Sequence, residues 1–129
     1  MRSYRLPKIL KKGYLRVSDG HRVYFELCGN PYGQPAVFIN GGPGGQFKDS
    51  HKRLFSSKYK VLFFDQRGAG RSKPTGKLKG NNTRLLIDDI ARLFDKEGFE
   101  SAIVAGTSCG TTLALCFAIN HPDLVSRLF

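Results

Sequence analysis

The sequence predicts an α/β fold with a mostly parallel sheet that is entered through an antiparallel hairpin. Three observations predict it. Short unbroken apolar runs alternate with segments of helical periodicity, loop residues flank those runs, and two β-rich runs separated by a turn come first. Continuous apolar runs suit strands that are buried on both faces, as in a parallel sheet covered by helices. The 129 residues, 40% of them apolar, are enough for one small domain with a core of its own.

The expected strands follow from local patterns. Residues 14–17 and 23–27 should form the hairpin, because the Ser-Asp-Gly-His run between them is a turn signal. Buried strands are expected at residues 36–39, 61–64 and 102–105, each an unbroken apolar run. These three strands should form the parallel part of the sheet, with helices between them.

Two helices are expected in the second half of the chain. Residues 85–94 carry apolar side chains at helical spacing, with Asn82 among the candidate N-caps and Gly98 as a stop signal. Residues 111–120 are almost wholly apolar and predict a buried helix that ends before Pro122. The final run, residues 124–129, is apolar and β-prone, and predicts the beginning of a further strand.

The net charge of +11 is unevenly distributed. Residues 1–84 hold 18 of the 21 Lys and Arg against 4 acids, a net +14, whereas residues 85–129 hold 3 against 6, a net −3. Because the basic residues are interspersed and form no block of like charge, an ordinary solvated surface is favoured and no nucleic-acid partner is expected. A face that binds polyanions stays open as an alternative.

The cysteines and the N-terminus indicate the compartment. Cys28, Cys109 and Cys116 are odd in number and lack CxxC spacing, which argues against a disulfide framework and a zinc site. The first twelve residues lack the apolar stretch of a signal peptide, and no 18-residue apolar run occurs. We therefore expect a cytoplasmic protein without a membrane association, a metal or another cofactor.

The run Gly-Thr-Ser-Cys-Gly at residues 106–110 carries the first chemical signal. It lies between a predicted strand and a predicted helix, where a G-x-S-x-G turn holds its serine in strained dihedrals and exposes the hydroxyl above the sheet. Ser108 is thus a candidate nucleophile, and the amide of Cys109 is free to donate to an oxyanion. The alternative is a glycine-rich turn in which Ser108 merely caps the helix.

A glycine-rich loop, Asn-Gly-Gly-Pro-Gly-Gly at residues 40–45, follows the strand at 36–39. It is not a nucleotide loop, since Gly-Lys-Ser/Thr is absent and Phe47 stands where the third glycine of G-x-G-x-x-G would be. In hydrolases with such a serine turn, this loop supplies the second oxyanion donor. We expect that donor to be Gly42, with Gly41, Pro43 and Gly44 shaping the loop.

The run Phe-Asp-Gln-Arg-Gly-Ala-Gly-Arg-Ser at residues 64–72 follows the strand at 61–64. Its glycines permit a tight loop, which Asp65 and Arg67 can hold through charge-assisted hydrogen bonds. A scaffold role is preferred for both residues. Asp65 as the acid of a catalytic triad is the alternative, but in this kind of hydrolase the acid follows the serine in the chain.

These three runs, with Gly-Tyr-Leu-Arg-Val-Ser-Asp-Gly-His at 13–21 and Gly-Asn-Pro at 29–31, resemble the proline iminopeptidases (prolyl aminopeptidases), serine peptidases of the α/β-hydrolase fold. The likeness covers nearly the whole chain but only the N-terminal part of the family's catalytic domain. It implies that Ser108 attacks the carbonyl of an N-terminal prolyl bond in a peptide while the amides of Gly42 and Cys109 hold the oxyanion.

Two residues depart from the family pattern. Asn40 stands where the family usually has His, and is expected to hydrogen-bond so that it fixes the loop. Cys109 stands where the family usually has Trp, and keeps the backbone donor without the aromatic bulk. Cys109 as the nucleophile itself is disfavoured, because the turn presents Ser108.

A serine nucleophile needs a base and an orienting acid, both expected after it in the chain. His121 and Asp123 are the candidates there, but about 12 helical residues place His121 roughly 18 Å from Ser108, too far for direct base catalysis. His21 and His51 precede the serine and are expected at the surface.

We therefore expect residues 1–129 to be an incomplete α/β-hydrolase domain, truncated after the helix that follows Ser108. The cap domain, the later strands and the groups that recognise the substrate amine would be absent, and the isolated chain inactive. The sheet edge near residues 101–105 should then be open to self-association. Another hydrolase of this fold, such as an esterase, and a non-catalytic binding module with a basic face are the alternatives.

Overall fold

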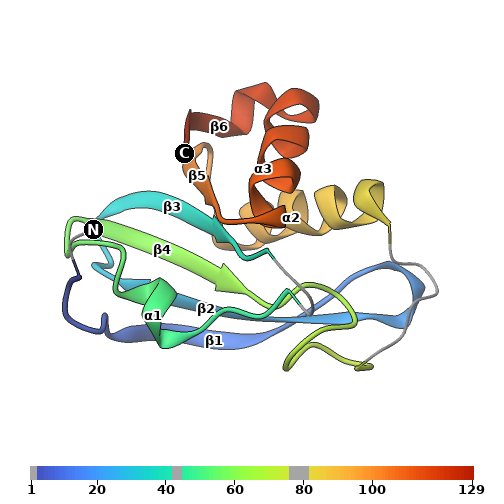
Figure 1. Cartoon of the computed structure of the whole chain (residues 1–129), viewed down its shortest axis with the longest axis horizontal. Helices are drawn as coiled ribbons and strands as arrows, with labels where there is room; N and C mark the ends of the chain where they lie inside the picture. Colours follow the sequence, from blue (N-terminus) through green and yellow to red (C-terminus); the bar gives the residue numbers. More distant parts are fainter. Residues whose placement is uncertain (1–2, 42–44, 76–81) are drawn as a thin grey trace.

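A computed structural model describes residues 3–41, 45–75 and 82–129 of the chain. In this part of the chain a six-stranded sheet has the order β1-β2-β4-β3-β5-β6. The strands are β1 (Ile9–Arg16), β2 (Arg22–Gly29), β3 (Gln34–Ile39), β4 (Tyr59–Phe64), β5 (Ala102–Gly106) and β6 (Val125–Leu128). The α-helices are α1 (Asp49–Lys52), α2 (Thr83–Glu97) and α3 (Cys109–Asn120). Figure 1 shows α2 and α3 on one side of the sheet and α1 on the other.

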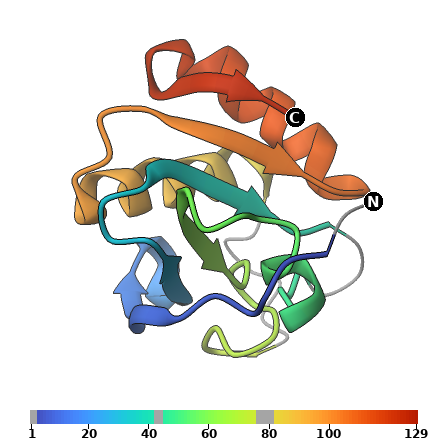
Figure 2. The same cartoon turned by 90° about the vertical axis from the view of Figure 1, so that its left-hand side faces the viewer.

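The pairing of the strands confirms the predicted fold class. β1 and β2 form an antiparallel hairpin, and β2 pairs antiparallel with β4. The pairs β3–β4, β3–β5 and β5–β6 are all parallel. In Figure 2 the strands fan across the molecule with the strong twist of an open sheet. The register sets Ile39, the last residue of β3, beside Gly106, the last residue of β5.

The apolar runs are strands because both faces of the sheet are covered. Alternate residues of β3 divide between two cores: Val37 and Ile39 pack toward α2 and α3, whereas Ala36 and Phe38 pack toward Phe47 on the opposite face. The same alternation divides β4. A strand buried on both sides has no polar positions to show a period of two, which explains the continuous runs.

The two long helices have the ends that their sequences predict. Asn82 caps α2, its Oδ1 accepting from the Leu85 amide at 3.0 Å, and Gly98 ends the helix at a φ of 69°. α3 begins at Cys109 and ends at Asn120, with His121 as its C-cap. None of the helices in the described ranges is both long and apolar enough to cross a membrane. The sequence patterns missed α1, whose four residues are too few for a helical period.

Two expectations were wrong. The edge near residues 101–105 is not open, because β6 pairs with β5 through Ala102–Val125 and Ile103–Arg127 and is itself the edge strand. His21 is not at the surface but 1% exposed, because the turn between β1 and β2 folds against the loop after β4. His51, the other histidine expected at the surface, is half-buried against Phe38.

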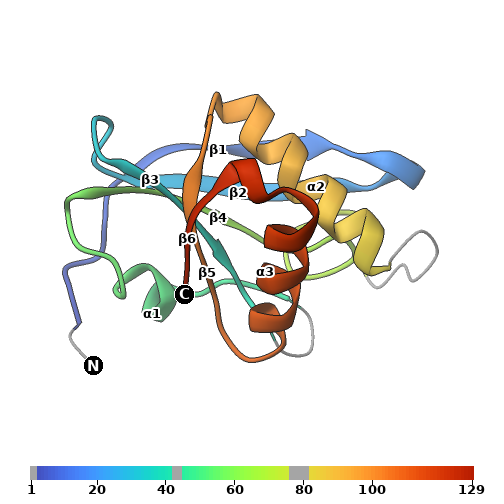
Figure 3. The ribbon, with the colours of Figure 1, turned by 90° about the horizontal axis from the view of Figure 1, so that it is seen from above.

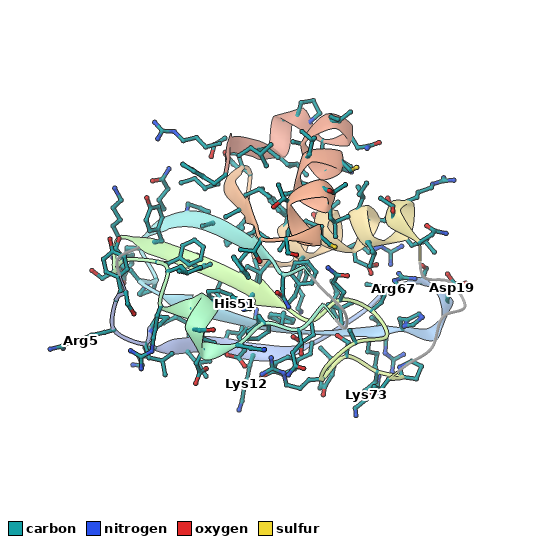
Figure 4. All side chains as sticks on the ribbon, viewed as in Figure 1. Arg5, Lys12, Asp19, His51, Arg67 and Lys73 are labelled. Carbon is teal, nitrogen blue, oxygen red and sulfur yellow. The ribbon has the colours of Figure 1, made fainter. Side chains whose placement is uncertain are left out.

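A buried ion pair holds that turn and α2 to the loop after β4. Arg67, fully buried, donates from Nε and Nη2 to the two carboxylate oxygens of Asp89 in α2, at 2.7 and 2.6 Å. The same guanidinium reaches the Ser18 hydroxyl at 3.1 Å and the Asp19 carboxylate at 3.8 Å. Figure 4 shows Arg67 and Asp19 together at the end of the hairpin. Three segments that are distant in sequence therefore meet at one side chain.

We expect Asp89→Asn to destabilise the chain by about 3 kcal/mol or more, because the Arg67 guanidinium would lose its buried counter-charge and keep only the more distant, partly exposed Asp19. The neighbouring Asp88, which is exposed, offers a matched control, and Asp88→Asn should change the free energy of unfolding by less than about 0.5 kcal/mol. Urea unfolding of the two variants measures both values. Equal stabilities would show that the ion pair is not needed.

Candidate active site

Ser108 occupies a strained turn between β5 and α3. Its backbone has a φ of 53° and a ψ of −126°. Asp19 is the other described non-glycine residue with a positive φ. Such a conformation costs a residue with a side chain about 1 to 3 kcal/mol and persists only where the surroundings impose it. Figure 3 shows β5 turning sharply into α3 at this point. This is the geometry that the G-x-S-x-G pattern predicted.

The surroundings that impose the turn are glycine backbones. A Cβ on Gly110 would lie 2.3 Å from the Ile39 carbonyl oxygen, and one on Gly106 would lie 2.4 Å from the Gly110 carbonyl oxygen. A Cβ on Gly41 would lie 2.2 Å from both the Thr107 oxygen and the Gly110 nitrogen. No side chain fits at these positions, so the end of β3 lies backbone to backbone against the serine turn.

The amide of Cys109 is placed to bind an oxyanion. Cys109 is the first residue of α3, and its N–H has no acceptor among residues 3–41, 45–75 and 82–129. An amide at a helix N-terminus favours negative charge. The Cβ position of Gly41 lies 2.5 Å from this nitrogen, so the glycine loop passes directly beside it. Gly42, Pro43 and Gly44 lie outside the described residues, and Gly42 as the second donor stays a prediction.

Asn40 and Gln66 hold the glycine loop together. Asn40 is buried, and its Nδ2 donates to the Gln46 carbonyl. The Gln66 side chain donates to the Asn40 carbonyl at 2.8 Å, and the Gln66 amide donates to the Gly45 carbonyl at 3.0 Å. The two ends of the loop are thus tied both to each other and to the loop after β4.

Asp65 and Arg71 bind the segment that follows the glycine loop. The Asp65 carboxylate, fully buried, accepts from the Phe47 amide at 3.0 Å and from Arg71 Nε at 2.8 Å. Arg71 Nη2 donates to the Phe47 carbonyl at 3.1 Å. The N–H and the C=O of Phe47 therefore both bind the Asp65–Arg71 ion pair. Because Asp65 is engaged in this way, its contacts suit a scaffold role better than that of a triad acid.

A pocket of about 370 Å³ opens beside the serine turn. Gly41, Gln66 and Cys109 line the side near Ser108, and residues of α2 and α3 line the rest: Thr83, Leu86, Thr112, Leu113 and Cys116. A larger pocket, about 510 Å³, lies at the other end of the strands around residues 4–8 and 55–57, away from these groups. The pocket at the serine turn is small, and among the residues that the structure describes none of those lining it is charged.

The three histidines of the chain lie on three different elements, and none of them has a described hydrogen bond to Ser108. His121 ends α3, a helix of 12 residues that begins at Cys109, so about 18 Å separates the two ends. Its ring packs on Phe117. His51 lies in α1, where burial and the charge of Lys48 lower its pKa. His21 lies in the turn between β1 and β2. Asp123 follows α3 in a short 3-10 helix, η2 (Pro122–Leu124).

The sequence patterns missed a buried charged cluster on β2. Glu26 is 4% exposed and binds Lys52 of α1, which is 5% exposed. Burial raises the pKa of Glu26, but hydrogen bonds from Lys52 and Tyr24 outweigh it and bring the pKa below the ordinary value. Burial and the Glu26 hydrogen bond raise the pKa of Tyr24 to about 12. Glu26 was missed because a charged residue within a β-rich run usually indicates the solvent face, whereas here four successive residues of β2, Phe25 to Cys28, are buried.

We expect Gly110→Ala to destabilise the chain by about 2 kcal/mol or more, because its Cβ would overlap the Ile39 carbonyl. Gly13→Ala is the control: its Cβ would meet Phe25 at an ordinary 3.8 Å, and it should change the free energy of unfolding by less than about 0.5 kcal/mol. Denaturant unfolding of both variants measures the difference. A neutral Gly110→Ala would contradict the backbone contact.

The strain at Ser108 predicts an unusual order of stability. Because glycine adopts a positive φ without strain, Ser108→Gly should be more stable than Ser108→Ala by about 1 to 2 kcal/mol. The two variants both lack the hydroxyl, so the comparison isolates the backbone. Thermal and urea unfolding measure it, and a more stable alanine variant would mean that the turn is not strained in solution.

Comparison with known proteins agrees with this geometry. Residues 35–129 match the family described as alpha/beta hydrolase fold. The chain is 46% identical over 117 residues to a proline iminopeptidase of Xylella fastidiosa (strain Temecula1), covering 90% of this chain and 37% of the relative. It is 47% identical over 109 residues to the proline iminopeptidase of Xanthomonas citri, covering 84% of this chain and 35% of that protein.

A solved structure of a related protein has the same fold as this chain. The proline iminopeptidase-related protein of Thermus thermophilus superposes with a TM-score of 0.76 at 26% identity, over 95% of this chain and 42% of that one. The chain therefore spans less than half the length of each of these three proteins. Because the family match spans residues 35–129, which is most of the chain, the chain belongs to the alpha/beta hydrolase fold family.

Proposed function

We propose that this chain supplies the nucleophile and part of the oxyanion hole of a serine aminopeptidase that releases N-terminal proline from peptides. The observation that carries the proposal is the positive φ of Ser108, at the junction of β5 and α3 and beside the Cys109 amide. A merely capping serine would have extended dihedrals and a side-chain bond into the helix; Ser108 has neither. The relatives named as proline iminopeptidases supply the substrate class.

In the proposed reaction, Ser108 Oγ attacks the carbonyl carbon of the N-terminal prolyl residue. Negative charge develops on the carbonyl oxygen, where the Cys109 amide and, by our proposal, the Gly42 amide donate hydrogen bonds. By this proposal, the strained turn holds the exposed Ser108 side chain and the Cys109 donor in place before substrate arrives. Such preorganised donors are effective because they need no reorganisation during the reaction.

The proton of Ser108 needs an acceptor that His121 and Asp123 do not provide, because both lie at the far end of α3 or beyond it. We propose that the general base, its acid partner and the groups that bind the substrate amine lie outside these 129 residues, and that the isolated chain does not turn over substrate. Three free thiols support a cytoplasmic setting. The outer edge of β6 is the surface at which we place any self-association.

A complementation assay tests the proposal. The chain is mixed with the part of the Xylella fastidiosa relative that the alignment leaves unmatched, and release of arylamine from a proline arylamide is followed. We expect no turnover by the chain alone and measurable turnover by the mixture. Ser108→Ala should reduce the turnover of the mixture by at least about 10³-fold.

Each other outcome has a definite meaning. Robust turnover by the chain alone would contradict the proposed absence of the base. Turnover retained by Ser108→Ala would overturn the nucleophile. Cleavage of a simple aryl ester but not of the proline arylamide would replace the aminopeptidase by an esterase of the same fold.

A further inference from the structure

Glu26 is held by side chains from three different segments. Lys52 of α1 approaches its Oε1 at 2.5 Å. The Tyr24 hydroxyl donates to its Oε2 at 2.6 Å, and Arg71, in the loop after β4, lies 3.5 Å from the same oxygen. The Cys28 thiol faces Oε1 at 4.0 Å. Through these bonds the buried carboxylate of Glu26 connects β2, α1 and the loop after β4.

The partners of Glu26 also surround Phe47. The Arg71 guanidinium carbon lies 4.2 Å from the centre of the Phe47 ring, and Lys52 Nζ lies 5.6 Å from it. The Tyr24 ring is nearly parallel to the Phe47 ring, with 6.2 Å between centroids and 9° between planes. Tyr24, Lys52 and Arg71 therefore each contact both Glu26 and Phe47, whose ring is 2% exposed.

Stability alone is a poor explanation for this cluster. Two charges taken out of water lose hydration that their attraction only partly restores, so a buried ion pair is often no better for stability than an apolar pair. What such a pair does provide is a fixed geometry, because displaced charges would remain buried without partners. The geometry fixed here is that of Phe47, the residue that follows the glycine loop by two positions.

We propose that Glu26 is a positioning residue for the oxyanion loop: through Tyr24, Lys52 and Arg71 it fixes Phe47, and with it the end of the loop that passes beside the Cys109 amide. Arg71 is the link, since it binds Glu26, the Phe47 carbonyl and Asp65 together. The importance of the loop rests on the proposed function, but its order can be measured without any turnover.

The test compares two glutamates whose side chains are equally shielded from solvent. Glu97 in α2 has the same side-chain exposure as Glu26, 5%, and also binds a lysine, Lys11, at 3.1 Å, but far from the loop. Hydrogen exchange at the Phe47 amide is followed by NMR, with Leu93 in the middle of α2 as the internal reference. We expect Glu26→Gln to accelerate exchange at Phe47 about tenfold or more relative to Leu93, and Glu97→Gln to leave this ratio unchanged.

A second variant covers the case in which Glu26→Gln does not fold. The pair Glu26→Gln with Lys52→Met removes both charges and avoids an unpaired buried lysine. It should fold and still show the faster exchange at Phe47 relative to Leu93. An unchanged ratio in the folded variants, or the same ratio change in Glu97→Gln, would overturn the proposal. Because the measurement uses the chain alone, its result is independent of whether complementation yields a proline-releasing enzyme.

Discussion

The contact between the end of β3 and the serine turn is the constraint on which the site depends. β3 and β5 are neighbours in the sheet, and their register sets Ile39 beside Gly106, so two loops leave the same edge of the sheet together. Gly41 and Gly110 then allow the backbones to touch where any side chain would collide. Because this contact fixes the backbone of the turn, Ser108 keeps a positive φ that is unfavourable for a residue with a side chain.

Around this contact, one loop supports both faces of the sheet. Asp65 and Arg67 are two residues apart, but their side chains bind partners on opposite faces of the sheet. Arg67 binds Asp89 of α2 and the turn between β1 and β2, and so holds the helix layer to the hairpin. Asp65 binds Arg71 and the Phe47 amide on the α1 face, and so holds the segment beyond the glycine loop. One short motif therefore ties together elements on both sides of the sheet.

Particular residues show how far the sequence could predict the structure. The strands at 36–39, 61–64 and 102–105 were correctly predicted because an unbroken apolar run is the direct result of burial on both faces. The strained turn at Ser108 was predicted because local sterics require glycines around it. The burial of His21 and the pairing of β6 with β5 were missed, since both depend on segments that meet only in three dimensions. Glu26 was missed for the same reason: its partners come from α1 and from the loop after β4.

The central claim is that the turn presents Ser108 Oγ beside the Cys109 amide, which has no acceptor among the residues that the structure describes. A proline boronic acid, which forms a tetrahedral adduct with a serine hydroxyl, tests it in the chain alone when the Cys109 amide proton is followed by NMR. The account predicts a large downfield shift of this proton, as a new oxyanion accepts its hydrogen bond, and no such shift in Ser108→Gly. The same shift in Ser108→Gly, or an adduct on the Cys109 thiol, would contradict it.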